Sequence, residues 1–354
     1  MTQMPQNAEP QMTQMTQNPG PQTPQTPQMP QNAEPQMTQM TQSPSGPAID
    51  VRGLSRRFGA FVAVNDLSFT VEPGEIFGFL GANGAGKSTT IRMLCGLLRP
   101  SAGTAIVGGE DVGRYPERVK RLIGYMSQKF SLYEALTVDQ NIAFFGGIYG
   151  LSGDRMASRR KFVLEMSGLE GRETTLTSQL PGGWRQRLAL GCAILHEPKI
   201  VFLDEPTGGV DPVSRRRFWD LIGDLSRKGV TVLVTTHYLD EAEHCHRIAI
   251  IQAGRLAALG TANQLKQAFA SRPIVEIHAS SPVTAMEILD RLPAVEKTSL
   301  FGTSVHAVLR STDTPAEALA TALRQAGIDV RSIGPVSPSL EDVFLDVVER
   351  AGAA

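Results

Sequence analysis

One short glycine-rich stretch constrains the fold of this chain more than any other feature of its sequence. It reads GFLGANGAGKSTT at residues 78–90 and contains the spacing GxxxxGK[ST]. A largely apolar run at residues 75–80 predicts a strand before it, and a helix is predicted after it, as a phosphate-binding loop requires. Glycines let backbone N–H groups surround a phosphate without interference from Cβ atoms, and the N-terminus of the following helix adds a favourable dipole. The expected phosphate-binding residues are Gly81, Ala82, Asn83, Gly84, Ala85, Gly86, Lys87, Ser88 and Thr89.

A pair of carboxylates follows a second apolar strand. The sequence IVFLDEP at residues 200–206 places Asp204 and Glu205 at the carboxyl end of this strand, where ligands bind in open α/β sheets. In such a site Lys87 would reach the β- and γ-phosphates of a nucleotide, and Ser88 and Asp204 would hold Mg²⁺. Glu205 can polarise an attacking water. Together these residues predict a site for a nucleotide and a metal ion.

The pattern of residues 49 to about 270 is typical of an α/β domain, because short β-branched runs alternate with turns and amphipathic stretches. The runs that begin near 76, 200 and 231 are continuously apolar, as buried parallel strands are. Thr137 and Gln140 form a capping box, so we expect a helix to begin there, although Gly146 and Gly147 weaken it. The predicted strands cover residues 60–64, 67–71, 75–80, 200–203, 231–235 and 248–252.

A smaller module is expected after residue 271. A final amphipathic segment at 339–350 carries Leu340, Val343, Phe344 and Val347 on one face, and we expect this segment to dock on another part of the protein. The predicted order before it, which is typical of a βαββαβ module, is a strand at 274–278, a helix at 283–291, two strands near 295–309, a helix at 315–326 and a strand at 328–333.

The first 47 residues differ from the rest in composition. They contain no Lys or Arg and are rich in Met, Thr, Gln, Pro and Asn, and the string MPQNAEPQMTQMTQ occurs twice, at 4–17 and 29–42. Such a composition buries too little apolar surface to order itself, so we expect a disordered tail. It lacks the basic and apolar regions of a signal peptide, and no window of about 18 apolar residues predicts a membrane span. We therefore expect a cytosolic chain that reaches a membrane only through a separate partner.

Several other groups of residues carry weaker signals. Cys95, Cys192 and Cys245 are far apart in the sequence, which suits a reduced compartment better than a disulfide framework. The net charge of −1 argues against binding to nucleic acid in bulk. The run His244–His246 does not predict zinc, because neighbours on a helix point to different sides. The run Arg215–Arg217 is expected to form a solvated helix face.

The remaining motifs occur in the order found in the ATP-binding cassette (ABC) family, which residues 50–260 resemble. Phe58 in RRFGA matches the aromatic residue that stacks on adenine, and Gln128 in YMSQKF matches the glutamine that meets Mg²⁺ and reports to the membrane subunit. LPGGWRQR at 180–187 matches the signature, Asp211 in GGVDP the D-loop, and His237 in TTHYLDEAE the switch histidine. The resemblance implies an α/β P-loop NTPase fold: a RecA-like core sheet, an antiparallel β subdomain and a helical subdomain at about 130–186, with the small α+β module following.

The resemblance also implies a mechanism. Cassettes of this family bind ATP and Mg²⁺ and dimerise head to tail, so that each ATP lies between the loop of one subunit and the signature of the other. By matching position, the catalytic residues are Lys87, Gln128, Glu205 and His237, the Mg²⁺ ligands are Ser88, Gln128 and Asp204, and the residues acting across the dimer are Gly182, Gly183 and Asp211.

The stretches SLYEALTVDQNIAFFGGIYGL and SLEDVFLDV resemble the exporter branch of the family, in which a separate permease carries drugs, lipids or polysaccharides. This implies an ATPase at the cytoplasmic side of the plasma membrane, partnered by transmembrane permease subunits, by an identical or different cassette and by a periplasmic adaptor, with no nucleic acid. The expected domains are a tail at 1–47, a nucleotide-binding domain at 48–270 and an accessory domain at 271–354.

Two alternatives remain open at this point. One is a regulator of the ribosome-associated type, although such proteins resemble two joined cassettes and this chain has one glycine-rich loop and one signature. The other is a catalytically weak subunit that pairs with an active relative, because Pro181 stands where the signature has a serine. Proline lacks the hydroxyl that would contact the γ-phosphate, although it is favoured in the first turn of a helix.

Overall fold

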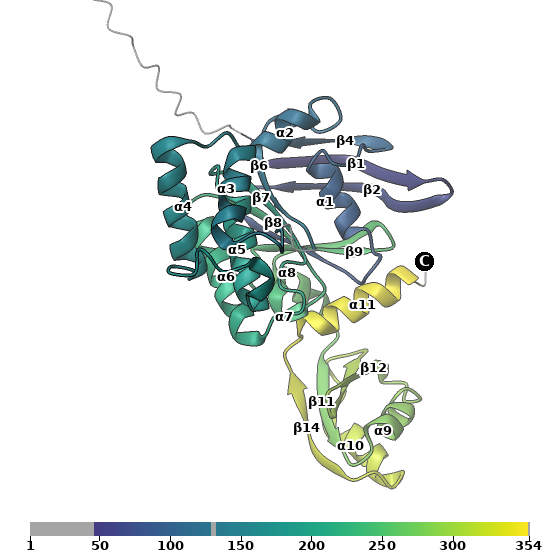
Figure 1. The fold of residues 1–354 in the computed structure, drawn as a ribbon. Coiled ribbons are helices and arrows are strands. Elements are labelled where there is room, and N and C mark those ends of the chain that lie inside the picture. The colour runs from purple at the N-terminus through teal and green to yellow at the C-terminus, as the bar shows by residue number, and fades with distance from the viewer. Residues whose placement is uncertain (1–45, 129–131, 353–354) are drawn as a thin grey trace, which may run out of the picture. The chain divides into compact units, whose positions relative to one another are not determined.

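Strands from distant parts of the sequence form the central sheet. The computed structural model describes residues 46–128 and 132–352, and within these residues the sheet has the strand order β10-β9-β3-β8-β7-β6 (Figure 1). Its strands run parallel, except that β10 is antiparallel to β9. The four strands predicted in this sheet are confirmed, whereas β6 and β10 were not predicted. The bounds are β3 Ile76–Leu80, β6 Ile123–Met126, β7 Ile200–Asp204, β8 Thr231–Thr236, β9 Arg247–Gln252 and β10 Arg255–Gly260.

The central strands are continuously apolar because both faces of the sheet are buried. On β3, Ile76 and Leu80 belong to one hydrophobic cluster, while Phe77 and Phe79 belong to a second cluster on the opposite face. Strands β7, β8 and β9 alternate between the same two clusters. Side chains on both faces of these strands are therefore buried. The strands lack the alternation of apolar and polar residues that a half-exposed strand shows. The tail that is predicted to be disordered lies outside the described residues, apart from residues 46 and 47.

A second sheet, antiparallel and with the order β2-β1-β4-β5, covers one face of the central sheet. Phe69 of this sheet packs on Phe77 and Phe79 of β3, with ring centroids 5.4 and 5.1 Å apart. The two strands predicted at 60–64 and 67–71 form one strand, which continues through an irregularity in its pairing where Asp66 adopts a φ of 60°. The bounds are β1 Ile49–Phe58, β2 Phe61–Val71, β4 Ala102–Val107 and β5 Glu110–Asp111, with the helices α1 Lys87–Leu94 and α2 Pro116–Leu122.

The helices α3, α4, α5 and α6 lie together on one side of the strands (Figure 1). The predicted capping box of α3 is confirmed: the Gln140 N–H donates to Thr137 Oγ1 at 3.2 Å, and the Thr137 N–H donates to Gln140 Oε1 at 2.9 Å. Helices α3 and α4 lie within the described part of the range 130–186, and the bounds of a helical subdomain there remain a prediction. The bounds are α3 Val138–Ile148, α4 Gly153–Ser167, η1 Thr177–Gln179, α5 Gly182–Ala193, α6 Pro212–Arg227 and α7 Leu239–Ala242.

The C-terminal part has the predicted βαββαβ order. Its antiparallel strands pair as β12-β13-β11-β14, and Val275 and Ile277 of β11 pack with Leu319 and Leu323 of α10. The bounds are β11 Ile274–Ala279, α9 Pro282–Leu289, β12 Val295–Phe301, β13 Ser304–Leu309, α10 Ala316–Gln325 and β14 Val330–Val336.

The last helix, α11 (Leu340–Gly352), docks as expected. Leu340 and Val343 are buried in the same hydrophobic cluster as Leu265 of α8 (Ala262–Lys266) and Phe269 of η2 (Gln267–Phe269). The helix also contacts α7, β9 and β10. Apolar packing therefore crosses the expected boundary at residue 270, which remains a prediction. None of the helices in the described part of the chain has both the length and the apolar character needed to cross a membrane.

Candidate active site

Four neighbouring strands of the central sheet end at one edge, and each delivers a predicted site residue there. Strand β3 leads into Gly81, β6 is followed shortly by Gln128, β7 ends at Asp204, and β8 leads into His237. The parallel register places Asp204 beside Thr235 of β8. Because the carboxyl ends of parallel strands meet at the same edge, residues separated by more than 100 positions lie together.

The backbone of the glycine-rich loop is fixed by close packing on its neighbours. A Cβ atom at Gly81 would lie 2.5 Å from the carbonyl oxygen of Ile251 on β9. A Cβ at Gly86 would lie 2.5 Å from the carbonyl oxygen of Ala63, and the φ of Gly86 is 104°. Gly86 is also the N-cap of α1, so no side chain caps this helix. The first turn of α1 therefore presents its N–H groups without a competing side chain, which suits a phosphate.

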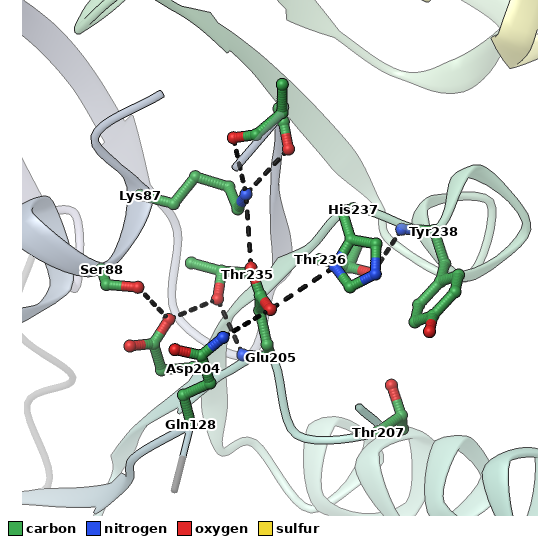
Figure 2. Close-up of polar contacts among 12 residues, drawn as sticks. Lys87, Ser88, Gln128, Asp204, Glu205, Thr207, Thr235, Thr236, His237 and Tyr238 are labelled. Carbon is green, nitrogen blue, oxygen red and sulfur yellow. Dashed lines mark hydrogen bonds and ion pairs between the residues drawn. The ribbon is translucent and has the colours of Figure 1, made fainter. Parts of the chain in front are cut away.

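Lys87 reaches back over the loop. Its ammonium group donates to the carbonyl oxygens of Gly81 at 2.7 Å and Ala82 at 3.1 Å, and lies 3.4 Å from Glu205 Oε1 (Figure 2). Only 4% of the Lys87 side chain is exposed. A buried ammonium is thus held where the loop would meet the phosphates of a nucleotide.

Asp204 is the acceptor for two hydroxyl groups. Ser88 Oγ donates to Asp204 Oδ1 at 2.9 Å, and Thr235 Oγ1 donates to the same oxygen at 2.8 Å (Figure 2). Burial raises the pKa of Asp204, although the two hydroxyl hydrogen bonds oppose that shift. A buried carboxylate beside a serine hydroxyl supplies the hard oxygen ligands that Mg²⁺ prefers, so the residues fit the predicted ion.

Glu205 lies at the centre of the site. Its carboxylate accepts a hydrogen bond from Gln128 Nε2 at 2.9 Å and lies 3.4 Å from His237 Nδ1, in addition to its ion pair with Lys87 (Figure 2). Its backbone has a φ of 47°, and its N–H donates to Thr235 Oγ1 at 2.8 Å. A glutamate in this left-handed region is strained, and such strain persists where surrounding contacts fix it. The catalytic residues predicted from the sequence are therefore brought together around one carboxylate.

Comparison with known proteins shows to which family this chain is related. Residues 64–208 match the family described as ABC transporter, and residues 260–348 match the family described as ATP-binding protein DrrA1-3-like, C-terminal domain. The daunorubicin/doxorubicin resistance ATP-binding protein DrrA of Streptomyces peucetius is 38% identical over 308 residues, which cover 84% of this chain and 91% of that relative. The chain belongs to the ABC transporter family.

Further relatives and structures agree with this ABC assignment. The protein named Probable multidrug ABC transporter ATP-binding protein YbhF of Escherichia coli is 50% identical over 218 residues, which cover 62% of this chain; the match spans 38% of that relative's length. A solved ATP-binding subunit of an ABC transporter is 32% identical, with a TM-score of 0.58, covering 63% of this chain and 93% of the solved chain. A bacterial ABC transporter cassette solved as a dimer is 25% identical with a TM-score of 0.56, covering 60% and 98%. The predicted family and fold are confirmed.

The residues of this ABC chain that we expect to act across a dimer make other contacts within the chain. Asp211 is the N-cap of α6, where its carboxylate accepts from the Ser214 N–H at 2.9 Å. A Cβ at Gly183 would lie 2.4 Å from Ser214 Oγ, whereas a Cβ at Gly182 would meet nothing within 4 Å. Gly183 is therefore needed for packing of α5 on α6, while Gly182 is free to approach a ligand. Phe58, expected to stack on adenine, is 46% exposed at the end of β1.

The prediction for the run Arg215–Arg217 is wrong at its first residue. Arg216 and Arg217 are exposed, but Arg215 is only 21% exposed and lies over the ring of Tyr238, 4.3 Å from its centroid. The chain brings this guanidinium to the buried carboxylate of Glu241, where Nε and Oε1 are 3.4 Å apart. A basic run on a helix predicts a solvated face when no partner is known. The carboxylate that Arg215 meets, Glu241 on α7, is 26 positions away, and the run itself does not indicate it.

Sequence reasoning missed the hydroxyl groups that hold this ABC site together. Thr235 bridges Asp204 and the backbone of Glu205, and Thr236 donates to Glu241 Oε2 at 2.7 Å. Two consecutive threonines at the end of an apolar strand, directly before His237, were the available signal, because both hydroxyls must find partners once buried.

The run His244–His246 makes contacts with neighbouring elements, and only its middle residue is buried. Cys245 is buried and free, as are Cys95 and Cys192. His244 stacks on Trp219 with ring centroids 5.1 Å apart, and His246 Nδ1 accepts from the Ile76 N–H at 2.9 Å. Within the described ranges there is no group of His, Cys, Asp and Glu that could hold a metal ion on its own.

Proposed function

We propose that this chain is the ATP-binding and ATP-hydrolysing subunit of an ABC exporter. The observation that carries the proposal is the position of Glu205, which contacts Lys87, Gln128 and His237 next to the pair formed by Ser88 and Asp204. A carboxylate in that position can orient and polarise a water for attack on the γ-phosphate.

The residues of the site divide the work of hydrolysis among them. Lys87 binds the β- and γ-phosphates together with the N–H groups of the loop, and Phe58 stacks on the adenine. Ser88, Asp204 and Gln128 would hold Mg²⁺, which would supply positive charge to neutralise the charge that develops on the phosphate oxygens. Glu205 accepts a hydrogen bond from the attacking water, and His237 fixes the orientation of Glu205 and of the γ-phosphate.

We further propose that two cassettes close head to tail around two ATP molecules. Gly182, Gly183 and Asp211 then act on the ATP bound by the partner, and the open space beside Gly182 supports this role. The partner is a second copy of this chain or a different cassette. A transmembrane permease, encoded separately, positions the pair at the cytoplasmic side of the plasma membrane, and a periplasmic adaptor completes the path.

The names of the relatives support export. They include a daunorubicin/doxorubicin resistance ATP-binding protein, a multidrug ABC transporter ATP-binding protein and Nod factor export ATP-binding proteins. These relatives favour the exporter over the ribosome-associated regulator. The proposal includes a nucleotide-binding domain at residues 48–270 and an accessory domain at residues 271–354.

Replacing Glu205 tests the chemistry. We expect Glu205→Gln to lower the rate of ATP hydrolysis about a hundredfold or more, because the amide cannot accept a proton from water. The matched control is Glu243→Gln, since Glu243 is 52% exposed and pairs only with the half-buried Lys266 in the described contacts. The measurement is phosphate release by the purified chain. Equal and negligible rates in wild type and Glu205→Gln would instead support a catalytically weak subunit.

Association tests the transport role. The tagged chain is purified from detergent-solubilised membranes, and the proteins that accompany it are identified. We expect a polytopic membrane protein in stoichiometric amount. Recovery with ribosomes and without a membrane protein would contradict the exporter and support the regulator.

A further inference from the structure

A buried carboxylate outside the site described above connects the three loops that carry its functional residues. Glu241, on α7, is 1% exposed. Its two oxygens accept hydrogen bonds from the hydroxyls of Thr207 and Thr236, and Oε1 lies 3.4 Å from Arg215 Nε. We call Thr207, Arg215, Thr236, Tyr238 and Glu241 the Glu241 cluster. A fully buried carboxylate is costly unless it is hydrogen-bonded or paired, and the hydroxyls of Thr207 and Thr236 and the guanidinium of Arg215 supply these partners.

Each partner of Glu241 lies in a different segment that carries, or directly precedes, a predicted site residue. Thr207 lies two residues after Glu205, on the turn that follows β7, and is 1% exposed. Thr236 is the last residue of β8 and directly precedes His237. Arg215 lies in the first turns of α6, whose N-cap is Asp211. One carboxylate thus contacts the segments that carry the general base, the switch histidine and the D-loop aspartate.

The contacts around His237 show how the cluster would act. Thr236 Oγ1 donates to Glu241 Oε2 at 2.7 Å. The same oxygen accepts a hydrogen bond from the Tyr238 N–H at 2.9 Å (Figure 2). The hydroxyl therefore ties together the backbone on both sides of His237, whose Nδ1 lies 3.4 Å from Glu205 Oε2. The ring of Tyr238 is in turn covered by the guanidinium of Arg215. Rotation of this short segment would move the imidazole away from Glu205.

We propose that Glu241 is a positioning residue for ATP hydrolysis, which holds His237 in register with Glu205 through Thr236 and couples both to the D-loop end of α6 through Arg215. The carboxylate is suited to this because it only accepts hydrogen bonds, both threonine hydroxyls donate to it, and the guanidinium of Arg215 adds a positive charge 3.4 Å away. An amide in its place would present N–H groups to at least one of them. This inference rests on the proposed ATPase function and goes beyond it by assigning the coupling of the loops to one buried charge.

The neighbouring residue Asp240 provides a matched control. Both carboxylates pair with Arg215, but Asp240 is 72% exposed and its oxygen lies 3.7 Å from the guanidinium. We expect Glu241→Gln to lower kcat about tenfold or more, with KM for ATP changed less than about threefold, because the loop that binds the phosphates is untouched. Asp240→Asn should leave both parameters within about twofold of wild type.

A second pair of variants separates positioning from general stability. Thr236→Val removes the hydroxyl and should reproduce the loss of kcat, whereas Thr236→Ser keeps the hydroxyl and should restore most of it. Hydrogen exchange of the segment 236–239 should accelerate in Glu241→Gln and Thr236→Val but not in Asp240→Asn.

The outcomes of these measurements are distinguishable. Glu241→Gln that lowers only the melting temperature, with wild-type kcat in the folded enzyme and unchanged exchange at 236–239, would overturn the inference. Absence of hydrolysis by the wild-type chain would instead refute the proposed function, while the exchange measurement would still report whether Glu241 fixes this segment.

Discussion

At the scale of single residues, Pro181 occupies a position that its chemistry suits. It is the N-cap of α5, one residue before the first turn in which we expected it, and its carbonyl oxygen accepts from the N–H groups of Trp184 and Arg185. The N–H of an N-cap residue takes no part in the helix, so proline loses nothing there. What it lacks is a side-chain acceptor for the helix and a hydroxyl for a phosphate bound by a partner.

Pro181→Ser should therefore have two modest effects. The serine hydroxyl can cap α5 and stabilise the chain by about 1 kcal/mol, which a thermal melt would detect. It can also donate to the γ-phosphate across the dimer, an interaction of about 1.5 to 3 kcal/mol that should change the hydrolysis rate or ATP affinity less than about a hundredfold. A larger gain in rate would show that the native site is nearly inactive.

At the scale of elements, α3 continues through two adjacent glycines that were expected to weaken it. The two glycines differ in their surroundings. A Cβ at Gly146 would lie 2.4 Å from the sulfur of Met156 on α4, whereas a Cβ at Gly147 would meet nothing within 4 Å. Gly146 thus permits the close approach of α4, while Gly147 is exposed and contributes only conformational freedom to the unfolded chain.

Alanine should separate these two roles. Gly147→Ala should stabilise the protein by about 0.5 to 1 kcal/mol, because alanine is the better helix former and the site is open. Gly146→Ala gains the same propensity but must displace the end of the Met156 side chain, so it should stabilise the protein less than Gly147→Ala does. Chemical denaturation of both variants measures the difference. Equal stabilisation by both would mean that α4 accommodates the methyl group without strain.

At the scale of the whole described chain, α11 joins two sets of contacts. Its apolar face packs beside α8 and η2, while Asp346, which is 3% exposed, accepts from Arg272 at 2.9 Å and lies 3.0 Å from Lys297 of β12. Burial alone would raise the pKa of Asp346, but the hydrogen bonds and charges of Arg272 and Lys297 outweigh it, so the pKa of this carboxyl is lowered. The ionised form is therefore favoured in the folded protein.

Asp346→Asn should destabilise the protein by about 1.5 to 3 kcal/mol near neutral pH, since it removes hydrogen bonds to charged groups. A lowered folded pKa contributes stability above the ordinary aspartate pKa of about 3.9, and this contribution is lost as the pH falls through the folded value. The difference between wild type and variant should thus shrink below about pH 4. Denaturant titrations across pH measure this difference in the free energy of unfolding.

The control is Glu349→Gln, because Glu349 also pairs with Lys297 but is 57% exposed. An equal loss of stability in this variant would contradict the role of burial.

The sequence determined those features whose hydrogen bonds and backbone geometry involve near neighbours. The glycine-rich loop before Lys87, the capping box of Thr137 and Gln140, and the order of elements after residue 271 were all predictable, because each depends on residues a few positions apart. The continuous apolar runs likewise predicted the buried strands. Strand β1 was missed because the alternation of Ile49, Asp50, Val51 and Arg52 is interrupted at Gly53, and β6 was missed because it is only four residues long.

Only the tertiary structure decided which side chains complete the site. Thr235 bonds to Asp204 across 31 positions, Glu241 bonds to Thr207 across 34, and Gln128 bonds to Glu205 across 77. These partners meet because parallel strands place their carboxyl ends at one edge, and no local pattern records which neighbours a strand will have. The sequence thus identified the chemistry of the reacting groups, whereas the sheet order determined the hydroxyls and charges that hold them in place.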